Sequence, residues 1–119
     1  MKTSETLAVL DQKQAIQMVS GNKKLADDLL LILIKECPGY KLTIQNELQN
    51  DNKEELKKII HKMHGGLKYV GAPALMDIVC RTDLEFFELS DEQIKRNITQ
   101  IFQEIERLLN VGKYSCKVA

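Results

Sequence analysis

Two histidines three residues apart, His61 and His64, are the side chains of this sequence best suited to chemistry. A neutral imidazole is a nucleophile that can hold a transferred group in a covalent intermediate, and it is also a common metal ligand. The sequence contains no GxxxxGKS/T loop and no glycine-rich nucleotide fingerprint. Kinase activity within the chain is therefore not expected, which leaves the histidines to act as group carriers or as ligands.

The helix that carries both histidines is predicted to begin at Asn52, which has capping-box spacing to Glu55, and to reach about residue 70. At roughly 100° per residue, its apolar residues gather in one sector that must face a core: Leu56, Ile59, Ile60, Met63, Leu67 and Val70. His61 lies about 150° from the centre of this sector. We therefore expect His61 to point to solvent.

The exposed side of this helix is also predicted to hold positive charge and an open space beside His61. Three lysines share or border that side: Lys57, Lys58 and Lys68. Glycine within a helix costs about 1 kcal/mol relative to alanine, so the presence of Gly65 and Gly66 in the middle of this helix requires an explanation. We expect Gly65, four residues after His61, to leave room for another protein, and Gly66 to permit close helix packing.

The elements that must position these residues are all predicted to be helices. Apolar residues recur at spacings of three and four in every long segment, and capping residues, glycines and prolines divide the chain into six helices: 11–20, 22–37, 40–49, 52–70, 73–89 and 90–109. Short connections make neighbouring helices antiparallel. We expect an all-α fold, an antiparallel up-down four-helix bundle with one or two additional short N-terminal helices. Residues 1–110 would form this domain, and residues 111–119 an unstructured tail or a segment added during cloning.

Composition limits the classes of partner. Seventeen basic residues balance seventeen acidic ones, so attraction to nucleic acid is not expected. No secretory signal opens the chain, and the longest apolar run, residues 29–34, is too short to span a bilayer, so no direct membrane contact is expected. Cys37, Cys80 and Cys116 are widely spaced and odd in number, which favours reduced thiols in the cytoplasm. The polar faces show no further apolar stripe, so we expect a monomer.

The stretch from His61 to Leu75, HKMHGGLKYVGAPAL, resembles the signature of histidine-containing phosphotransfer (HPt) domains. In that signature the phosphorylated histidine is followed by a glycine four residues on, a second glycine ten residues on, and a leucine four residues beyond. Gly65, Gly71 and Leu75 fill these places when His61 is the phosphorylated residue. Helix order extends the resemblance more loosely to about residues 7–109.

The same signature sets the register of the two histidines. His64 does not fit the phosphorylated place, because Lys68 and Ala74 would stand where the glycines belong. His64 instead occupies the place three residues after the phosphorylated histidine, where most relatives have lysine. In this respect, and in the turn at residues 71–73, the chain is similar to the HPt domains that end hybrid sensor kinases of the BarA/GacS kind.

The resemblance implies a histidine phosphotransfer module of a bacterial multistep phosphorelay. His61 would accept a phosphoryl group from the receiver-domain aspartate of a hybrid sensor kinase and pass it to the aspartate of a response regulator. The module would need no cofactor of its own, since the receiver domain brings Mg²⁺ and a lysine. It would be either a free-standing protein or the cytoplasmic C-terminal part of an inner-membrane sensor kinase.

Phosphoryl transfer would place two requirements on the surroundings of His61. Its attacking nitrogen, expected to be Nε2, must be unprotonated, so a side chain on a neighbouring helix should hold the other ring nitrogen; Asp83 and Glu85 are candidates. Charge on the transferred group must be balanced, either by protonated His64 or by the three lysines. Candidates on the first helix for a small docking surface are Ala15, Ile16 and Met18.

Two other functions remain open. His61 and His64 could share a metal ion with Cys80 or an acidic group, but HxxH alone is a weak signal and supplies no clear third ligand. A helical adaptor that binds a partner without chemistry would explain the bundle. It would not explain the joint placement of His61, Gly65 and the lysines.

Overall fold

The computed structural model describes the backbone of residues 7–115 and the side chains of residues 7–111. Its elements are α1 (Gln12–Met18), α2 (Lys23–Gln49), α3 (Lys53–Leu67), α4 (Pro73–Glu85), the short 3-10 helix η1 (Phe86–Glu88) and α5 (Asp91–Ser115). The described residues include no strand, so the predicted all-α class is confirmed. None of the helices in this part of the chain has the length and hydropathy needed to cross a bilayer.

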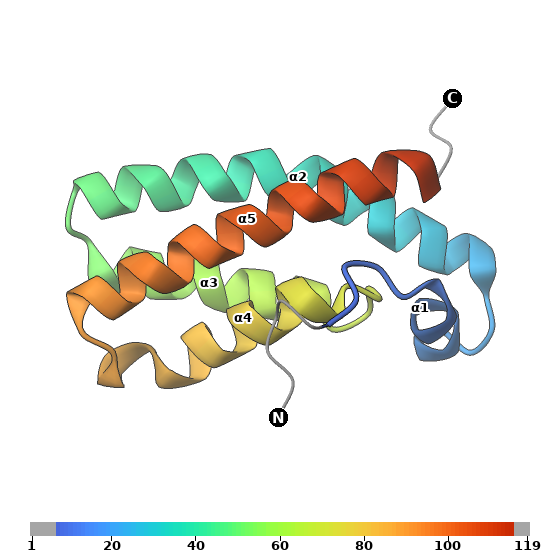
Figure 1. The fold of residues 1–119 in the computed structure, drawn as a ribbon, viewed down its shortest axis with the longest axis horizontal. Helices are drawn as coiled ribbons and strands as arrows, with labels where there is room; N and C mark the ends of the chain where they lie inside the picture. Colours follow the sequence, from blue (N-terminus) through green and yellow to red (C-terminus); the bar gives the residue numbers. More distant parts are fainter. Residues whose placement is uncertain (1–6, 116–119) are drawn as a thin grey trace.

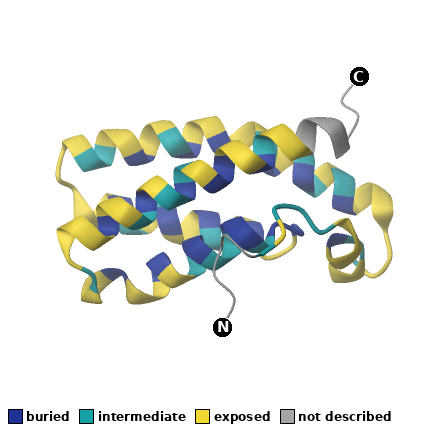
Figure 2. Cartoon of the chain, viewed as in Figure 1, coloured by how far each residue is buried: buried dark blue, intermediate teal, exposed yellow. Residues whose placement is uncertain are grey.

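Helices α2 to α5 form a four-helix bundle in which consecutive helices run antiparallel, and α1 packs against α2 at one end (Figure 1). The buried residues lie on the faces that the four long helices turn toward one another, while the outer faces are exposed (Figure 2). The centre of this core includes Ile44, Ile60, Met63, Leu75, Ile78, Ile98 and Ile101. The predicted four-helix bundle is therefore confirmed.

Helix α3 has the orientation predicted from its periodicity. The side chain of Asn52 accepts a hydrogen bond from the backbone N–H of Glu55 at 3.2 Å, which caps the helix. The predicted apolar sector is buried at Leu56, Ile60, Met63, Leu67 and Val70 and half-buried at Ile59. His61 lies on the opposite, exposed side.

The predicted break between the second and third helices at Pro38 and Gly39 is wrong, because α2 runs through both residues without interruption. Proline inside a helix removes one backbone hydrogen bond and costs about 3 kcal/mol. Both residues are exposed, and the buried stripe of α2 continues past them, with Leu30, Leu33, Cys37, Tyr40 and Ile44. Packing of this stripe against α3 and α5 outweighs the preference of Pro38 and Gly39 to end a helix.

The C-terminal boundaries also differ from the prediction. The predicted helix 73–89 is divided into α4 and η1, and a capping box between Ser90 and Gln93 then starts α5 as expected. Helix α5 continues to Ser115, so an unstructured tail from residue 111 is wrong over 111–115. Each residue added to an existing helix gains a backbone hydrogen bond without new packing. Such an extension leaves no apolar periodicity in the sequence, so the pattern did not predict it. Residues 116–119 lie outside the described residues.

The turn between α3 and α4 is covered by the segment that precedes α1. The backbone N–H of Asp11 donates to the carbonyl of Gly71 at 2.6 Å, and that of Ala74 donates to the carbonyl of Ala8 at 3.0 Å. A Cβ atom at residue 71 would lie only 2.1 Å from the Asp11 carbonyl oxygen. Only glycine fits at residue 71, and its close contact with Asp11 holds the N-terminal segment against this turn.

Candidate functional site

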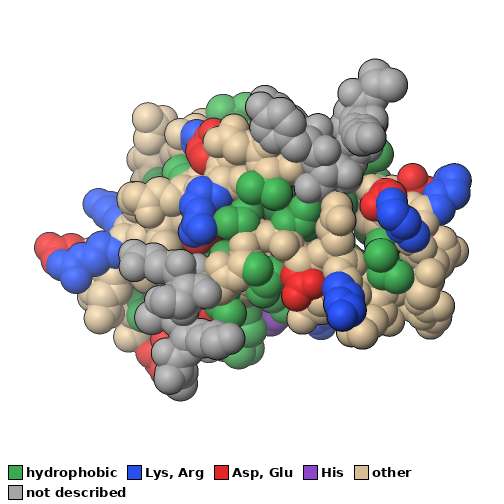
Figure 3. Space-filling view, turned by 45° about the vertical axis from the view of Figure 1, so that its right-hand side comes forward, with side chains coloured by type: hydrophobic (Ala, Val, Ile, Leu, Met, Phe, Trp, Pro, Cys, Tyr) green, Lys and Arg blue, Asp and Glu red, His purple; other side chains and the backbone are tan. Residues whose placement is uncertain are grey.

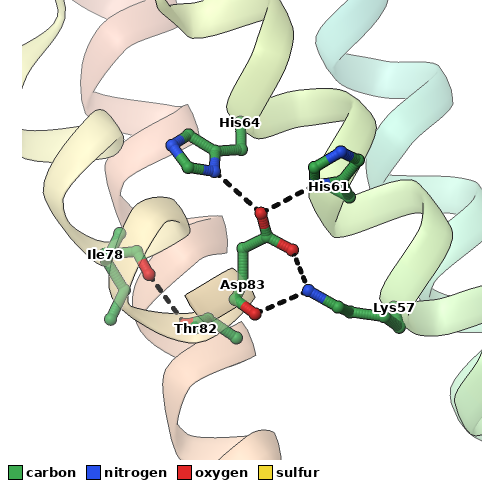
Figure 4. A network of polar contacts seen from close by, with 6 residues as sticks. All are labelled: Lys57, His61, His64, Ile78, Thr82 and Asp83. Carbon is green, nitrogen blue, oxygen red and sulfur yellow. Dashed lines mark hydrogen bonds and ion pairs between the residues drawn. The ribbon is translucent and has the colours of Figure 1, made fainter. Parts of the chain in front are cut away.

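His61 projects from the middle of α3, and 74% of its side chain is exposed. Its Nδ1 lies 2.9 Å from Oδ2 of Asp83, in the last turn of α4 (Figure 4). The predicted exposure of His61 is confirmed, although one side of its ring is held by the neighbouring helix. In Figure 3 a histidine side chain is visible only at the lower edge, so the site does not lie on the face shown there.

Asp83 is the centre of a polar network between α3 and α4 (Figure 4). Its side chain is only 2% exposed, and Oδ2 also lies 2.7 Å from Nδ1 of His64. Nζ of Lys57 donates to Oδ1 and, at 2.6 Å, to the backbone carbonyl of the same aspartate. A buried carboxylate is stable only when paired, and these three side chains supply that pairing.

These contacts fix the ionisation of Asp83 and thereby the tautomer of the histidines. Burial by itself raises the pKa of Asp83, but hydrogen bonds from Lys57, His64 and His61 outweigh it and hold the pKa well below its ordinary value. An ionised carboxylate can only accept hydrogen bonds, so Nδ1 of each imidazole must donate. In a neutral imidazole, Nε2 is then unprotonated and carries a lone pair.

His64 makes the same contact as His61 from a different position. It lies one turn further along α3, its side chain is 14% exposed, and the two ring centroids are 6.4 Å apart with the rings nearly perpendicular. Both Nδ1 atoms share one oxygen of Asp83. Of the two rings, that of His61 is therefore the more accessible.

The predicted lysines divide into one that joins the network and two that do not. Lys57 is half-buried and engaged by Asp83. Lys58 instead pairs with Glu55 at 3.1 Å, and Lys68 is exposed at the C-terminal end of α3. Of the basic patch expected around His61, only Lys57 belongs to the network, and its charge is paired with the carboxylate of Asp83.

Of the two candidates for orienting His61, the structure places Asp83 in contact with the ring. Glu85 is exposed and does not belong to the network drawn in Figure 4. Sequence reasoning gave no ground for choosing between them, because the choice depends on how α4 is rotated against α3.

The helix surface beside His61 is open at Gly65. A Cβ atom built there would meet nothing within 4 Å, so the backbone does not need glycine for packing. At Gly66 a Cβ atom would meet only the hydroxyl of Tyr40, at an ordinary contact distance of 3.8 Å. The prediction that Gly66 permits close helix packing is therefore wrong, while Gly65 retains the open space expected of it.

Two exposed hydrophobic side chains, Leu84 and Phe87, follow Asp83 along the chain, at the end of α4 and in η1. Nζ of Lys57 lies 6.0 Å from the centroid of the Phe87 ring. Sequence reasoning missed both, because it assigned residues 73–89 to one continuous helix. Of the three predicted docking residues on α1, Ala15 is buried, whereas Met18 is exposed and Ile16 half-buried.

The described side chains also include one group with the composition of a metal site. Ligand atoms of His61, His64 and Asp83 all lie within 4.8 Å of one another. Cys80, the ligand considered from the sequence, does not belong to this group. The third ligand that the HxxH pair lacked in the sequence is thus supplied by α4.

Comparison with known proteins gives one family match. A model of the Hpt domain family matches residues 28–111. The crystal structure of the HPT domain from an Hpt sensor hybrid histidine kinase of Shewanella superposes with a TM-score of 0.84, covering 93% of this chain and 96% of that one. Its sequence is 19% identical, so this likeness concerns the fold.

Curated relatives agree with the family match. The chain is 25% identical over 112 residues to the signal transduction histidine-protein kinase BarA of Escherichia coli K12 and 24% identical over 102 residues to the sensor histidine kinase GacS of Pseudomonas protegens. These alignments cover 93% and 86% of this chain. They cover only 12% and 11% of the relatives, so the chain corresponds to a small part of each.

Proposed function

Because the chain belongs to the Hpt domain family, its role is histidine phosphotransfer in a phosphorelay, and we propose that His61 carries the phosphoryl group. The family expected from the signature is confirmed, and the carrier residue is our inference. One observation carries it: the exposed imidazole of His61 donates through Nδ1 to the ionised Asp83. In the neutral ring this contact leaves Nε2 with a lone pair that a phosphoryl donor can reach.

The proposed transfer uses the lone pair of Nε2. It attacks the phosphorus of an aspartyl phosphate in line, and a P–N bond forms as the P–O bond breaks and its electron pair leaves with the aspartate carboxylate. The Nδ1 proton stays between His61 and Asp83, where the ionised carboxylate stabilises the positive charge that develops on the ring. The reverse reaction delivers the group to a second receiver.

In this proposal the charge on the transferred group is balanced mainly from outside the domain. Lys57 is engaged by Asp83 and Lys58 by Glu55. We infer that the receiver supplies Mg²⁺ and a lysine at the phosphoryl group, with Lys68 and protonated His64 as secondary sources of charge. The domain itself then requires no cofactor for the transfer.

HPt domains of hybrid kinases work with receiver domains in phosphorelays. We propose that this chain, as a monomer, accepts the phosphoryl group from the receiver domain of a hybrid sensor kinase and passes it to a response regulator in the cytoplasm. The receiver would approach over the open surface at Gly65 and contact the exposed Leu84 and Phe87. An exposed apolar pair beside a polar network suits a small and short-lived interface.

The carrier residue is tested by incubating the chain with a receiver domain whose aspartyl phosphate is radiolabelled. Wild type should acquire acid-labile, alkali-stable phosphate, and His61→Gln should acquire none. Because Lys57 and His64 still pair the buried Asp83 in this variant, the loss of one hydrogen bond should lower the free energy of unfolding by only about 1 kcal/mol. The His64→Gln variant should still be labelled at His61. Label on His61→Gln but not on His64→Gln would contradict the assignment.

A further inference from the structure

We propose that Nδ1 of His61, Nδ1 of His64 and Oδ2 of Asp83 form a binding site for a divalent transition-metal ion, of which Zn²⁺ is the best-fitting example, and that metal binding blocks phosphoryl transfer. The binding part of the proposal rests only on the three side chains. The block rests on the proposed function of His61.

The spacing of the three ligand atoms fits a small metal ion. Oδ2 of Asp83 lies 2.9 Å from Nδ1 of His61 and 2.7 Å from Nδ1 of His64, and each of the three residues offers a ligand atom within 4.8 Å of the others. Ligands of a tetrahedral Zn²⁺ with bonds of about 2.1 Å lie roughly 3.4 Å apart. Small side-chain shifts would therefore convert two hydrogen bonds into three metal bonds.

The chemistry and placement of the ligands favour zinc over a hard cation. Two imidazoles and one carboxylate are a ligand set that Zn²⁺ uses when its fourth position is open to water. Because 74% of the His61 side chain is exposed, water can reach this part of the site. The histidines stand one turn apart on α3, and the third ligand comes from α4, so the packed bundle already holds both sides of the site together.

Asp83 is prepared to act as a ligand. Its carboxylate already accepts hydrogen bonds from Lys57, His61 and His64, and an oxygen that accepts hydrogen bonds has the lone pairs that a metal ion needs. Lys57 contacts Oδ1 and the backbone carbonyl rather than Oδ2, which orients the carboxylate and leaves Oδ2 for the metal. The positive charge of Lys57 also repels the ion, so this lysine should limit affinity.

Metal binding and phosphoryl transfer require opposite tautomers of His61. To donate its Nδ1 lone pair to the metal, a neutral imidazole must carry its proton on Nε2, and that proton moves from Nδ1 through solvent. Two N–H···O hydrogen bonds are lost, three metal bonds form, and the number of protons on the site does not change. The protonated Nε2 has no lone pair to attack phosphorus, so a metal-loaded domain cannot accept the group.

Calorimetric titration of the full chain with ZnCl₂ alone tests the site. Wild type should bind one ion, and His64→Gln and Asp83→Asn should each weaken binding on the order of 100-fold, because either change removes a ligand. Lys57→Gln should tighten binding. Matched controls on α4, Asp77→Asn and Cys80→Ser, should bind as wild type does. Zinc affinity equal to that of wild type in His64→Gln or in Asp83→Asn, or loss of binding in Cys80→Ser, would overturn the site.

Cobalt gives an independent measurement that does not depend on how the variants fold. Co²⁺ bound to wild type should show the visible absorption of a tetrahedral nitrogen and oxygen site. A thiolate charge-transfer band would instead place the ion on a cysteine and contradict the proposal.

The block is tested with phosphoramidate, a small phosphoryl donor that needs no receiver. Uptake by wild type should fall in proportion to zinc occupancy and recover on chelation. The His64→Gln variant should take up phosphate at the same rate with this zinc concentration as without zinc, because it no longer binds the ion. Zinc that binds without slowing uptake would refute the block. Failure of His61 to accept phosphate without metal would instead refute the proposed function, while the calorimetric result would still stand.

Discussion

The two glycines of the signature lie on the same segment but in opposite environments. Around Gly65 the surface of α3 is open, with nothing within 4 Å of an added Cβ atom. At Gly71 an added Cβ atom would collide with the Asp11 carbonyl oxygen and with Ala15. One glycine thus leaves space outside the fold, and the other is required within it.

This difference divides a single sequence signature into a reactive part and a structural part. The part at His61 to Gly65 presents an exposed ring and an open surface to a partner. The part at Gly71 to Leu75 joins the N-terminal segment to the bundle, where Leu75 is fully buried. Substitutions in the reactive part should therefore change the rate of phosphoryl transfer, and substitutions in the structural part should change the free energy of unfolding.

The largest effect is expected at Gly71. Gly71→Ala should lower the free energy of unfolding by about 3 kcal/mol, because the new methyl group forces backbone of the N-terminal segment apart. Gly65→Ala should instead be neutral or raise it by up to about 1 kcal/mol, as alanine favours helix. Urea denaturation followed by circular dichroism measures both. Equal stability of the two variants would remove the distinction between the glycines.

The structural part shows how far local pattern predicts this fold. The periodicity of α3 correctly predicted its buried face, because Leu56, Ile60 and Met63 lie on one side of a single helix. The break predicted at Pro38 is wrong because the preference of one residue competes with packing along the whole of α2. That packing involves α3 and α5, and the local preference of Pro38 carries no information about it.

The reactive part was predictable only as far as it lies on one helix. The exposure of His61 and the open surface at Gly65 follow from positions along α3. The contacts of Asp83 with Lys57 and His64 join residues 26 and 19 positions apart, and they depend on the rotation of α4. Sequence spacing carries no information about that rotation. For this reason Lys57 was expected to stabilise the phosphoryl group, whereas in the structure it pairs with Asp83.

Within the reactive part, Asp83→Asn should slow phosphoryl uptake from phosphoramidate by about 10- to 100-fold, because an amide no longer fixes Nδ1–H on His61. Two-bond proton–nitrogen NMR should show His61 as the Nδ1–H tautomer in wild type and as a mixture in the variant. Glu85→Gln, also on α4, is the matched control. An unchanged tautomer with slowed uptake would mean that Asp83 does not act by positioning His61.

Gly65→Gln tests whether open space matters to the partner rather than to the chemistry. Transfer from a phosphorylated receiver should fall about tenfold, equivalent to roughly 1.4 kcal/mol, while uptake from phosphoramidate falls much less. Gly39→Gln places the same side chain at an open helical site on α2 and should transfer normally. Normal receiver transfer by Gly65→Gln would show that a receiver does not approach over this surface.

The smallest effect concerns acid stability and reports on the Asp83 network itself. Because the folded pKa of Asp83 is held below its ordinary value, its contribution is fully present above an unfolded pKa of about 3.9 and is lost as pH falls through the folded pKa. Asp83→Asn lacks this titration. Wild type should therefore exceed the variant by about 1–2 kcal/mol in free energy of unfolding at pH 6, and by less at pH 3. A difference that stays constant from pH 6 to pH 3 would show that the hydrogen bonds to Asp83 do not favour its ionised form.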